Sequence, residues 1–212
     1  MMTLAKRPAL IVVDMQNDFV RQGAPMEVPP AREILPRLAR VIDAFRAADL
    51  PVIYTRYVAA PDYRQLQDRL PWLKLIEAPV RSCKPGHMRR FQDRDTARDA
   101  ADVVDELTPR EGDMVIDKIF FSAFHGTDLD ARLRSARIDG LVVTGTLTEM
   151  CVEDTARHAV HFGYPTALVR DCVASNVAQA QTATLLAFGT NYGWVLDSAE
   201  LHAALAERGQ AC

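Results

Sequence analysis

The stretch Ala9-Leu10-Ile11-Val12-Val13, which Asp14 follows directly, decides the fold class of this chain of 212 residues. An unbroken apolar run of this length is typical of a strand that is buried on both faces of a parallel sheet. Short runs of the same kind recur along the chain. Together they predict six strands, at residues 9–13, 52–54, 114–117, 141–144, 166–169 and 194–196.

Helical patterns separate these predicted strands. Apolar residues recur at helical spacing from Ile34 to Phe45, and we expect Pro36 in the first turn of that helix, where its missing N–H costs little. A last helix begins near Ser198, and the others are predicted at residues 97–107, 129–137, 151–162 and 182–188. This strict alternation predicts one α/β domain over residues 1–212, with a parallel sheet covered by helices on both faces.

The longest irregular segment of the chain covers residues 57–94 and is rich in proline, arginine and polar side chains. Loops of this length inside a compact domain are usually functional. We therefore interpret residues 57–94 as a variable arm or lid within the domain.

The composition excludes several classes of protein. The chain is 49% apolar and 25% charged, as in globular proteins with a sizeable core. Its 25 basic and 28 acidic residues leave no basic excess for a phosphate backbone, so we predict no nucleic-acid partner. We see neither a signal peptide nor an apolar run of ~20 residues, and predict no membrane association. The cysteines form no C-x-x-C pair or disulfide framework, which favours the cytoplasm; they are Cys83, Cys151, Cys172 and Cys212.

Three chemically complementary side chains follow predicted strands. Asp14 follows the first strand, Lys118 the third, and Cys151 lies just past the fourth. In such sheets the ligand crevice lies outside the carboxyl ends of the strands. A thiolate at a helix N-terminus is stabilised by free N–H groups and by a nearby lysine, and a carboxylate can carry its proton to a leaving amine. The set predicts acyl transfer through a thioester, with backbone N–H groups at residues 145–151 as an oxyanion hole.

Each residue alone also fits a structural role. Asp14 could cap a loop, Lys118 could be a surface lysine, and Cys151 could be an inert buried thiol. A second hypothesis is a thiol redox or sensor protein, in which Cys151 is oxidised and Cys172 resolves it. A third is a catalytically silent binding protein.

Three ordered segments carry a resemblance to a known family. They read VDMQNDF at 13–19, KIFFSAFHGTDL at 118–129 and VTGTLTEMCV at 143–152. They resemble the isochorismatase-like cysteine hydrolases, which include nicotinamidases and ureidoacrylate, carbamoylsarcosine and biuret amidohydrolases. The resemblance implies a six-stranded parallel sheet of order 3-2-1-4-5-6 with helices on both faces, and a homodimer or homotetramer.

The resemblance also implies roles for individual residues. Cys151 would be the nucleophile, Asp14 the proton carrier and Lys118 the cation that tunes both. The oxyanion hole would use the backbone N–H groups of Leu147 and Cys151, with a cis peptide bond between Thr146 and Leu147.

The family pattern further narrows the expected substrate. Nicotinamidases carry an Asp-x-His pair after the second strand to hold a metal, whereas residues 55–62 contain no histidine here. Isochorismatases proper lack the nucleophilic cysteine, so Cys151 implies amide C–N hydrolysis, without a metal or other cofactor. Because arginine recognises planar carboxylate and ureide groups, we expect a small ureido-, carbamoyl- or carboxylate-bearing amide as substrate. The candidate substrate-binding residues are Gln16 (which could also brace the Asp14 loop), Phe19, Arg56, Tyr57 and Phe124.

Overall fold

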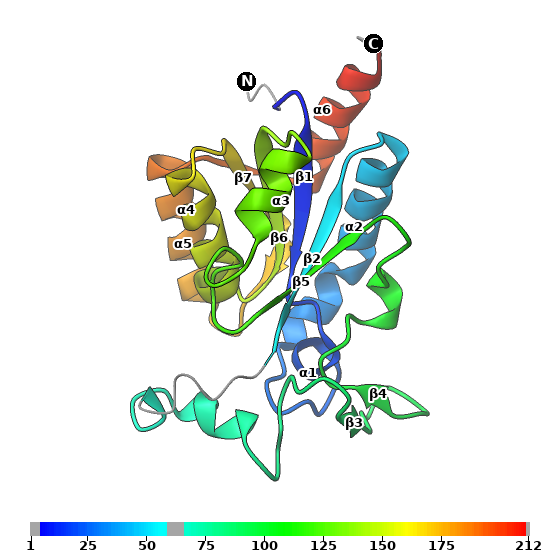
Figure 1. Cartoon of the computed structure of the whole chain (residues 1–212), viewed down its shortest axis with the longest axis vertical. Helices are drawn as coiled ribbons and strands as arrows, with labels where there is room; N and C mark the ends of the chain where they lie inside the picture. Colours follow the sequence, from blue (N-terminus) through cyan, green and yellow to red (C-terminus); the bar gives the residue numbers. More distant parts are fainter. Residues whose placement is uncertain (1–4, 59–65, 211–212) are drawn as a thin grey trace.

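The strand that opens the sequence, β1 (Pro8–Val13), lies in the middle of a six-stranded parallel sheet (Figure 1). The computed structural model describes residues 5–58 and 66–210. The other strands are β2 (Val52–Tyr57), β5 (Met114–Lys118), β6 (Gly140–Thr146), β7 (Thr166–Ala174) and β8 (Trp194–Leu196). Their order is β5-β2-β1-β6-β7-β8. All neighbours are parallel, which confirms the predicted sheet and its strand order.

Helices cover both faces of this sheet (Figure 1). On one face lie α2 (Pro29–Ala47) and α6 (Ser198–Gln210); on the other lie α3 (Leu129–Ser135), α4 (Glu153–His161) and α5 (Ala178–Asn191). In β1, Leu10 and Val12 join the apolar cluster under α2, whereas Ile11 and Val13 join the cluster under α4. Because successive side chains of a strand point to opposite faces, burial on both faces requires the unbroken apolar run.

The helix predicted at residues 97–107 is wrong. This segment contains the short strand β4 (Arg98–Asp99), which pairs with β3 (Met88–Arg89), and a 3-10 turn, η3 (Asp105–Leu107). Its backbone bonds to the loop after β1: the N–H of Asn17 donates to the carbonyl of Asp102, and that of Asp18 to Ala100. These long-range bonds replace the internal bonds of a helix, and the apolar spacing does not reveal them.

Helix α2 begins earlier than predicted. Pro29 and Pro30 occupy its first turn, where their fixed φ suits a helix start. Pro36 therefore lies inside the helix and not in its first turn, which corrects the prediction.

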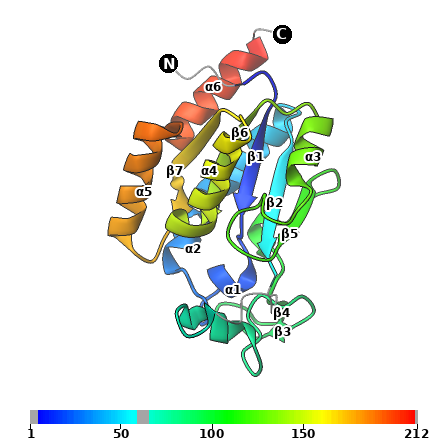
Figure 2. The same ribbon diagram turned by 60° about the vertical axis from the view of Figure 1, so that its left-hand side comes forward.

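The described part of the predicted arm lies beyond the carboxyl ends of the strands, at the bottom of Figures 1 and 2, next to α1 (Asn17–Val20). It contains a 3-10 turn, η2 (Pro71–Ile76), and β3. Residues 59–65 of the arm and Cys212 lie outside the described residues. In the part of the chain that the structure describes, no helix is long and apolar enough to cross a membrane.

Gly145 in β6 allows the close approach of this strand to β1. Its φ is +104°, and a Cβ atom there would lie 2.1 Å from the carbonyl oxygen of Val13. We expect Gly145→Ala to lower the free energy of unfolding by about 3 kcal/mol or more, because the contact is with backbone that cannot move aside. Gly112 has a similar φ of +95° and nothing within 4 Å, so Gly112→Ala is the matched control. Urea denaturation measures the free energy of unfolding of both variants. Equal losses of stability would contradict a steric clash at residue 145.

Candidate active site

Asp14 follows β1 with a φ of +49°, a left-handed conformation that a non-glycine residue rarely adopts and that is common at functional sites. Its side chain is fully buried. The hydroxyl of Thr55 donates to Asp14 Oδ1 at 2.7 Å, and the Asp14 N–H donates to the Thr55 carbonyl at 3.2 Å. The neighbouring strand therefore fixes the direction of the carboxylate.

Lys118, the last residue of β5, is also fully buried. Its Nζ lies 2.6 Å from Asp14 Oδ2 and 3.3 Å from Cys151 Sγ, and it donates to the carbonyl of Phe120 at 2.8 Å. An ammonium has three donors, and each has a partner here. The lysine therefore joins the carboxylate to the sulfur.

Cys151 lies in a single π-helical turn, Thr148–Val152, that precedes α4. The α-helix predicted at residues 151–162 begins only at Glu153. The residue is 7% exposed and packs in the cluster under α4. The structure therefore brings Asp14, Lys118 and Cys151 together from three different parts of the sequence.

The titration of the Cys151 thiol differs from the sequence expectation. Burial raises its pKa, and the charge of Asp14 and a hydrogen bond to it raise it further, while Lys118 acts in the opposite direction. The net pKa is raised, so the resting site holds a neutral thiol and not the thiolate that a helix N-terminus would favour. The expected stabilisation of the thiolate is outweighed because the sulfur is removed from water beside a carboxylate.

The lysine keeps its charge in this buried site. Burial alone acts to lower the pKa of Lys118, but the charge of Asp14 and the contacts of the ammonium with Asp14 and the Cys151 sulfur raise it above its usual value. At neutral pH the lysine of this site is therefore an ammonium and the cysteine is a thiol.

The turn between β6 and Cys151 contains the cis peptide bond Thr146–Leu147. The carbonyl of Leu147 accepts hydrogen bonds from the N–H groups of Met150 and Val152, both at 3.1 Å. The use of the Leu147 and Cys151 N–H groups as an oxyanion hole stays a prediction.

Gln16 braces the loop that carries Asp14. Its amide donates to the carbonyls of Tyr57 and Ala101, both at 2.9 Å, and its oxygen accepts from the Tyr57 N–H at 2.7 Å. Both N–H donors of this buried amide are engaged by the protein backbone, so Gln16 braces the loop. Its place among the substrate-binding residues stays a prediction.

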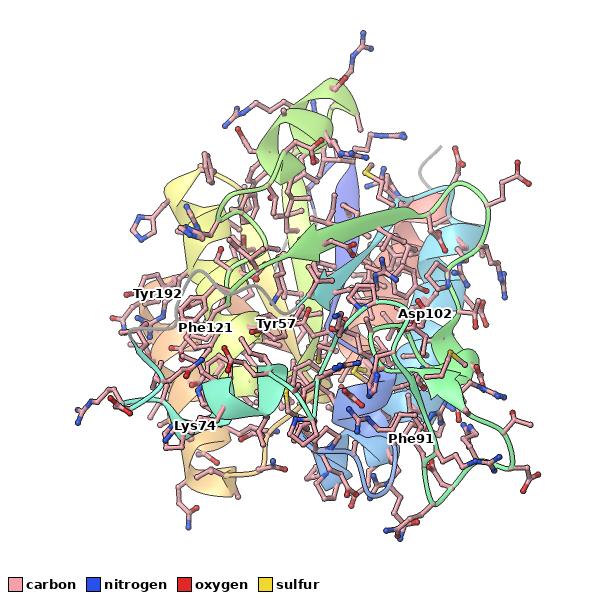
Figure 3. All side chains as sticks on the ribbon, turned by 60° about the horizontal axis from the view of Figure 1, so that its bottom comes forward. Tyr57, Lys74, Phe91, Asp102, Phe121 and Tyr192 are labelled. Carbon is pink, nitrogen blue, oxygen red and sulfur yellow. The ribbon has the colours of Figure 1, made fainter. Side chains whose placement is uncertain are left out.

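Arg56 does not face the thiol, contrary to the predicted substrate contact. Its guanidinium donates to both carboxylate oxygens of Asp117, at 2.8 and 3.0 Å, and to Asp102 at 2.8 Å. Asp117 neighbours Lys118 in the strand, and consecutive side chains of a strand point to opposite faces. In Figure 3 Asp102 lies on the opposite side of Tyr57 from Phe121.

Tyr57 belongs to an aromatic cluster with Trp72, Phe120 and Phe121, and Figure 3 shows Tyr57 near Phe121. The ring centre of Tyr57 lies 5.6 Å from Lys118 Nζ. Trp72 of the arm contacts Tyr57 edge-on, with ring centres 6.2 Å apart, and packs at 5.7 Å from Phe121, which stacks on Phe120. The cluster therefore joins the arm to Lys118.

Phe19 and Phe124 are both nearly buried, and they lie in different apolar clusters. Phe124 shares its cluster with Cys151 and stacks on Phe162, with ring centres 5.1 Å apart. Phe19 packs in the cluster under α2. Their role as pocket walls stays a prediction.

Cys172 does not face Cys151. It points from β7 into the cluster under α2, whereas its neighbour Val173 and Cys151 lie in the cluster under α4. A disulfide needs two Cβ atoms about 4 Å apart. The packing on opposite faces of the sheet therefore argues against Cys172 as a resolving cysteine.

Two residues with structural importance for the site escaped sequence reasoning. Thr55 directs the Asp14 carboxylate. The sequence feature that could have revealed it is a hydroxyl residue directly after the predicted strand at 52–54. Asp18 is a second fully buried carboxylate, four residues after Asp14. Across residues 5–58 and 66–210, no group of three or more His, Cys, Asp or Glu side chains is placed to hold a metal ion.

A parallel α/β sheet with a buried thiol, carboxylate and ammonium at its strand ends defines the class: an enzyme fold with a cysteine nucleophile. The family model of the isochorismatase domain matches residues 8–200, and the chain belongs to this family.

Individual relatives agree with this assignment. The chain is 34% identical to ureidoacrylate amidohydrolase RutB of Methylorubrum extorquens over 209 residues, which cover 95% of this chain and 84% of the relative. A cysteine hydrolase from Pseudomonas syringae pv. phaseolicola superposes with a TM-score of 0.82 at 27% identity, over 98% of this chain and 97% of that one. N-carbamoylsarcosine amidase from Thermoplasma acidophilum superposes with a TM-score of 0.72 at 30% identity, over 91% of this chain and 96% of that one.

Proposed function

We propose that this chain is a metal-independent cysteine amidohydrolase that cleaves a C–N bond of a small ureido-, carbamoyl- or carboxylate-bearing amide through a thioester. The observation that carries the proposal is the contact of one buried ammonium, Lys118 Nζ, with both Asp14 Oδ2 and Cys151 Sγ. A thiol, its proton acceptor and a fixed cation are the groups that acyl transfer requires.

Acylation begins with the neutral thiol. The substrate carbonyl carbon approaches Cys151 Sγ, and the thiol proton passes to Asp14 as the S–C bond forms. The carbonyl electron pair moves to oxygen, where the Leu147 and Cys151 N–H groups stabilise it. When this pair returns, the C–N bond breaks, and the leaving nitrogen takes the proton from Asp14.

Hydrolysis of the thioester uses the same carboxylate. Asp14 accepts a proton from water as the water oxygen attacks the thioester carbon. The S–C bond then breaks, and the sulfur regains the proton from Asp14. Throughout the cycle Lys118 stays an ammonium and holds Asp14 beside the sulfur.

The substrate class rests on the relatives and on one departure from the nicotinamidase pattern. The relatives include a protein named as a ureidoacrylate amidohydrolase and one named as a carbamoylsarcosine amidase. Residues 55–62 have no histidine for the metal of nicotinamidases. Because Arg56 is held by Asp117 and Asp102, it is no longer part of the argument for this substrate class.

A panel of amides tests the proposal: a ureido acid, biuret, carbamoylsarcosine, maleamate and nicotinamide, each with and without a chelator. We expect ammonia release from a ureido or carbamoyl member that the chelator does not reduce, and little from nicotinamide. Release that stops with the chelator and returns with added metal would contradict metal independence.

We further propose a cytoplasmic location and a homodimer or homotetramer. Cys83, Cys151 and Cys172 are free thiols, as expected in a reducing compartment. The oligomeric state follows from the family resemblance, and light scattering of the purified chain measures it.

A further inference from the structure

Asp18 is a buried carboxylate that the proposed reaction does not use. It lies in α1, four residues after Asp14, and is fully inaccessible to solvent. Its Oδ2 accepts the backbone N–H of Cys83 at 2.9 Å, and its Oδ1 accepts from Nε of Arg89 at 2.8 Å. Both partners belong to the arm. A single side chain of the loop after β1 therefore holds the arm at two points.

The segment that Asp18 holds has an unusual backbone. Arg81 and Cys83 have φ values of +53° and +51°, in the left-handed region that non-glycine residues rarely adopt. Such conformations persist where surrounding contacts impose them. The bond from the Cys83 N–H to Asp18 is one of these contacts.

The held segment is connected to the aromatic cluster. The Ser82 N–H donates to the carbonyl of Leu75 in η2 at 2.9 Å. The same turn carries Trp72, which packs against Phe121 and Tyr57 beside Lys118. Asp18 is therefore connected to Lys118 by a chain of contacts that passes through Ser82, the turn η2 and Tyr57.

The same segment also lies within electrostatic reach of the catalytic groups. Burial raises the pKa of the Cys83 thiol, the charges of Asp18 and Asp14 raise it further, and Lys118 lowers it. The arm at Cys83 therefore lies within reach of the charges of Asp14 and Lys118.

We propose that Asp18 is a positioning residue that fixes the arm against the thiol site through Cys83 and Arg89, and thereby controls access to Cys151 and substrate affinity. The kinetic part of this inference rests on the proposed function, whereas the part on access to the thiol does not.

The rate at which iodoacetamide alkylates each cysteine measures how accessible its thiol is. The change Asp18→Asn keeps the size of the side chain and removes the charge that pairs with Arg89. We expect iodoacetamide to modify Cys151 and Cys83 about tenfold faster than in the wild type, as measured by peptide mass spectrometry at a fixed, mildly alkaline pH. Cys172, whose pKa burial raises to about 12, is the internal reference and should not change.

The control variant is Asp128→Asn, which removes an exposed carboxylate paired with Arg132 and should leave all rates unchanged. Unchanged Cys151 alkylation in Asp18→Asn would overturn the proposal. An equal increase at Cys172 would also overturn it, because it would mean a general loosening of the fold.

Arg89→Met tests the same contact from the arm and serves if Asp18→Asn does not fold, since Arg89 is only partly buried. With an amide that the enzyme hydrolyses, we expect both variants to raise KM by about tenfold and to change kcat much less. A fall in kcat with unchanged KM would contradict the positioning role. If no amide is hydrolysed, the proposed function fails, while the alkylation rates still decide the role of Asp18.

Discussion

Replacing Cys151 with alanine should reduce ammonia release by a factor of about 10⁴ or more for any amide that the wild-type enzyme hydrolyses. The thiol is the only protein group that forms a bond to the substrate carbon in the proposed cycle. The side chain is small and nearly buried, so the fold should lose at most about 2 kcal/mol of stability. Single-turnover kinetics and urea denaturation measure the two effects.

The matched control is Cys172→Ala, which removes a buried thiol on the other face of the sheet. We expect it to keep nearly full turnover. Acid quenching of the wild type during turnover should also give a Cys151 peptide with the mass of the added acyl group. Sustained turnover in Cys151→Ala would refute the thioester, and loss of activity in Cys172→Ala would revive a role for the second thiol.

The second large effect is expected for Lys118→Met. This change keeps the apolar stem and leaves the fully buried carboxylate of Asp14 without its counterion. Removal of one partner of a buried ion pair costs about 3–5 kcal/mol of stability. We also expect turnover to fall by about 10³-fold, because the carboxylate then takes up a proton and can no longer accept one from the thiol.

The double variant Asp14→Asn/Lys118→Met separates the two consequences. It removes both charges, so the free energy of unfolding should recover relative to Lys118→Met alone, while turnover stays lost. Recovery of turnover, or a further loss of stability, would contradict the pairing.

The free energy of unfolding of the wild type should fall at high pH, where Lys118 loses its proton. Folding raises the pKa of Lys118 above its usual 10.5, so its contribution to stability is complete below that pH. The contribution is lost as the pH rises through the folded-state pKa. It is therefore fully present at neutral pH, where the variants are compared.

The strands were predictable because each is a short apolar run. In the central strands β1 and β6, burial on both faces leaves little choice of residue. The segment at 97–107 was not predictable, because its backbone bonds to the loop after β1, and such partners leave no periodic signal in the sequence. The start of α2 was placed too late for a related reason. Pro29 and Pro30 resemble loop residues in sequence but open the helix in the structure.

For the candidate site, the sequence predicted which residues take part but not the surroundings that set their properties. Residue types and spacing were sufficient to select Asp14, Lys118 and Cys151 and to place them at strand ends. They were not sufficient to predict the protonation state of the thiol, because that depends on burial and on the carboxylate beside it. They also assigned Arg56 to the substrate, whereas Asp117 in the neighbouring strand binds it.

The sequence by itself determined the parallel α/β sheet, its strand order through the family resemblance, and the three groups that carry the proposed chemistry. Only the tertiary structure decided which face each side chain points to, that Gln16 braces the loop, and that Asp18 holds the arm. The physical reason is that apolar periodicity and residue chemistry are local properties of the chain. The pairing of buried polar groups depends instead on atoms brought together from distant segments, and burial makes each such pairing obligatory.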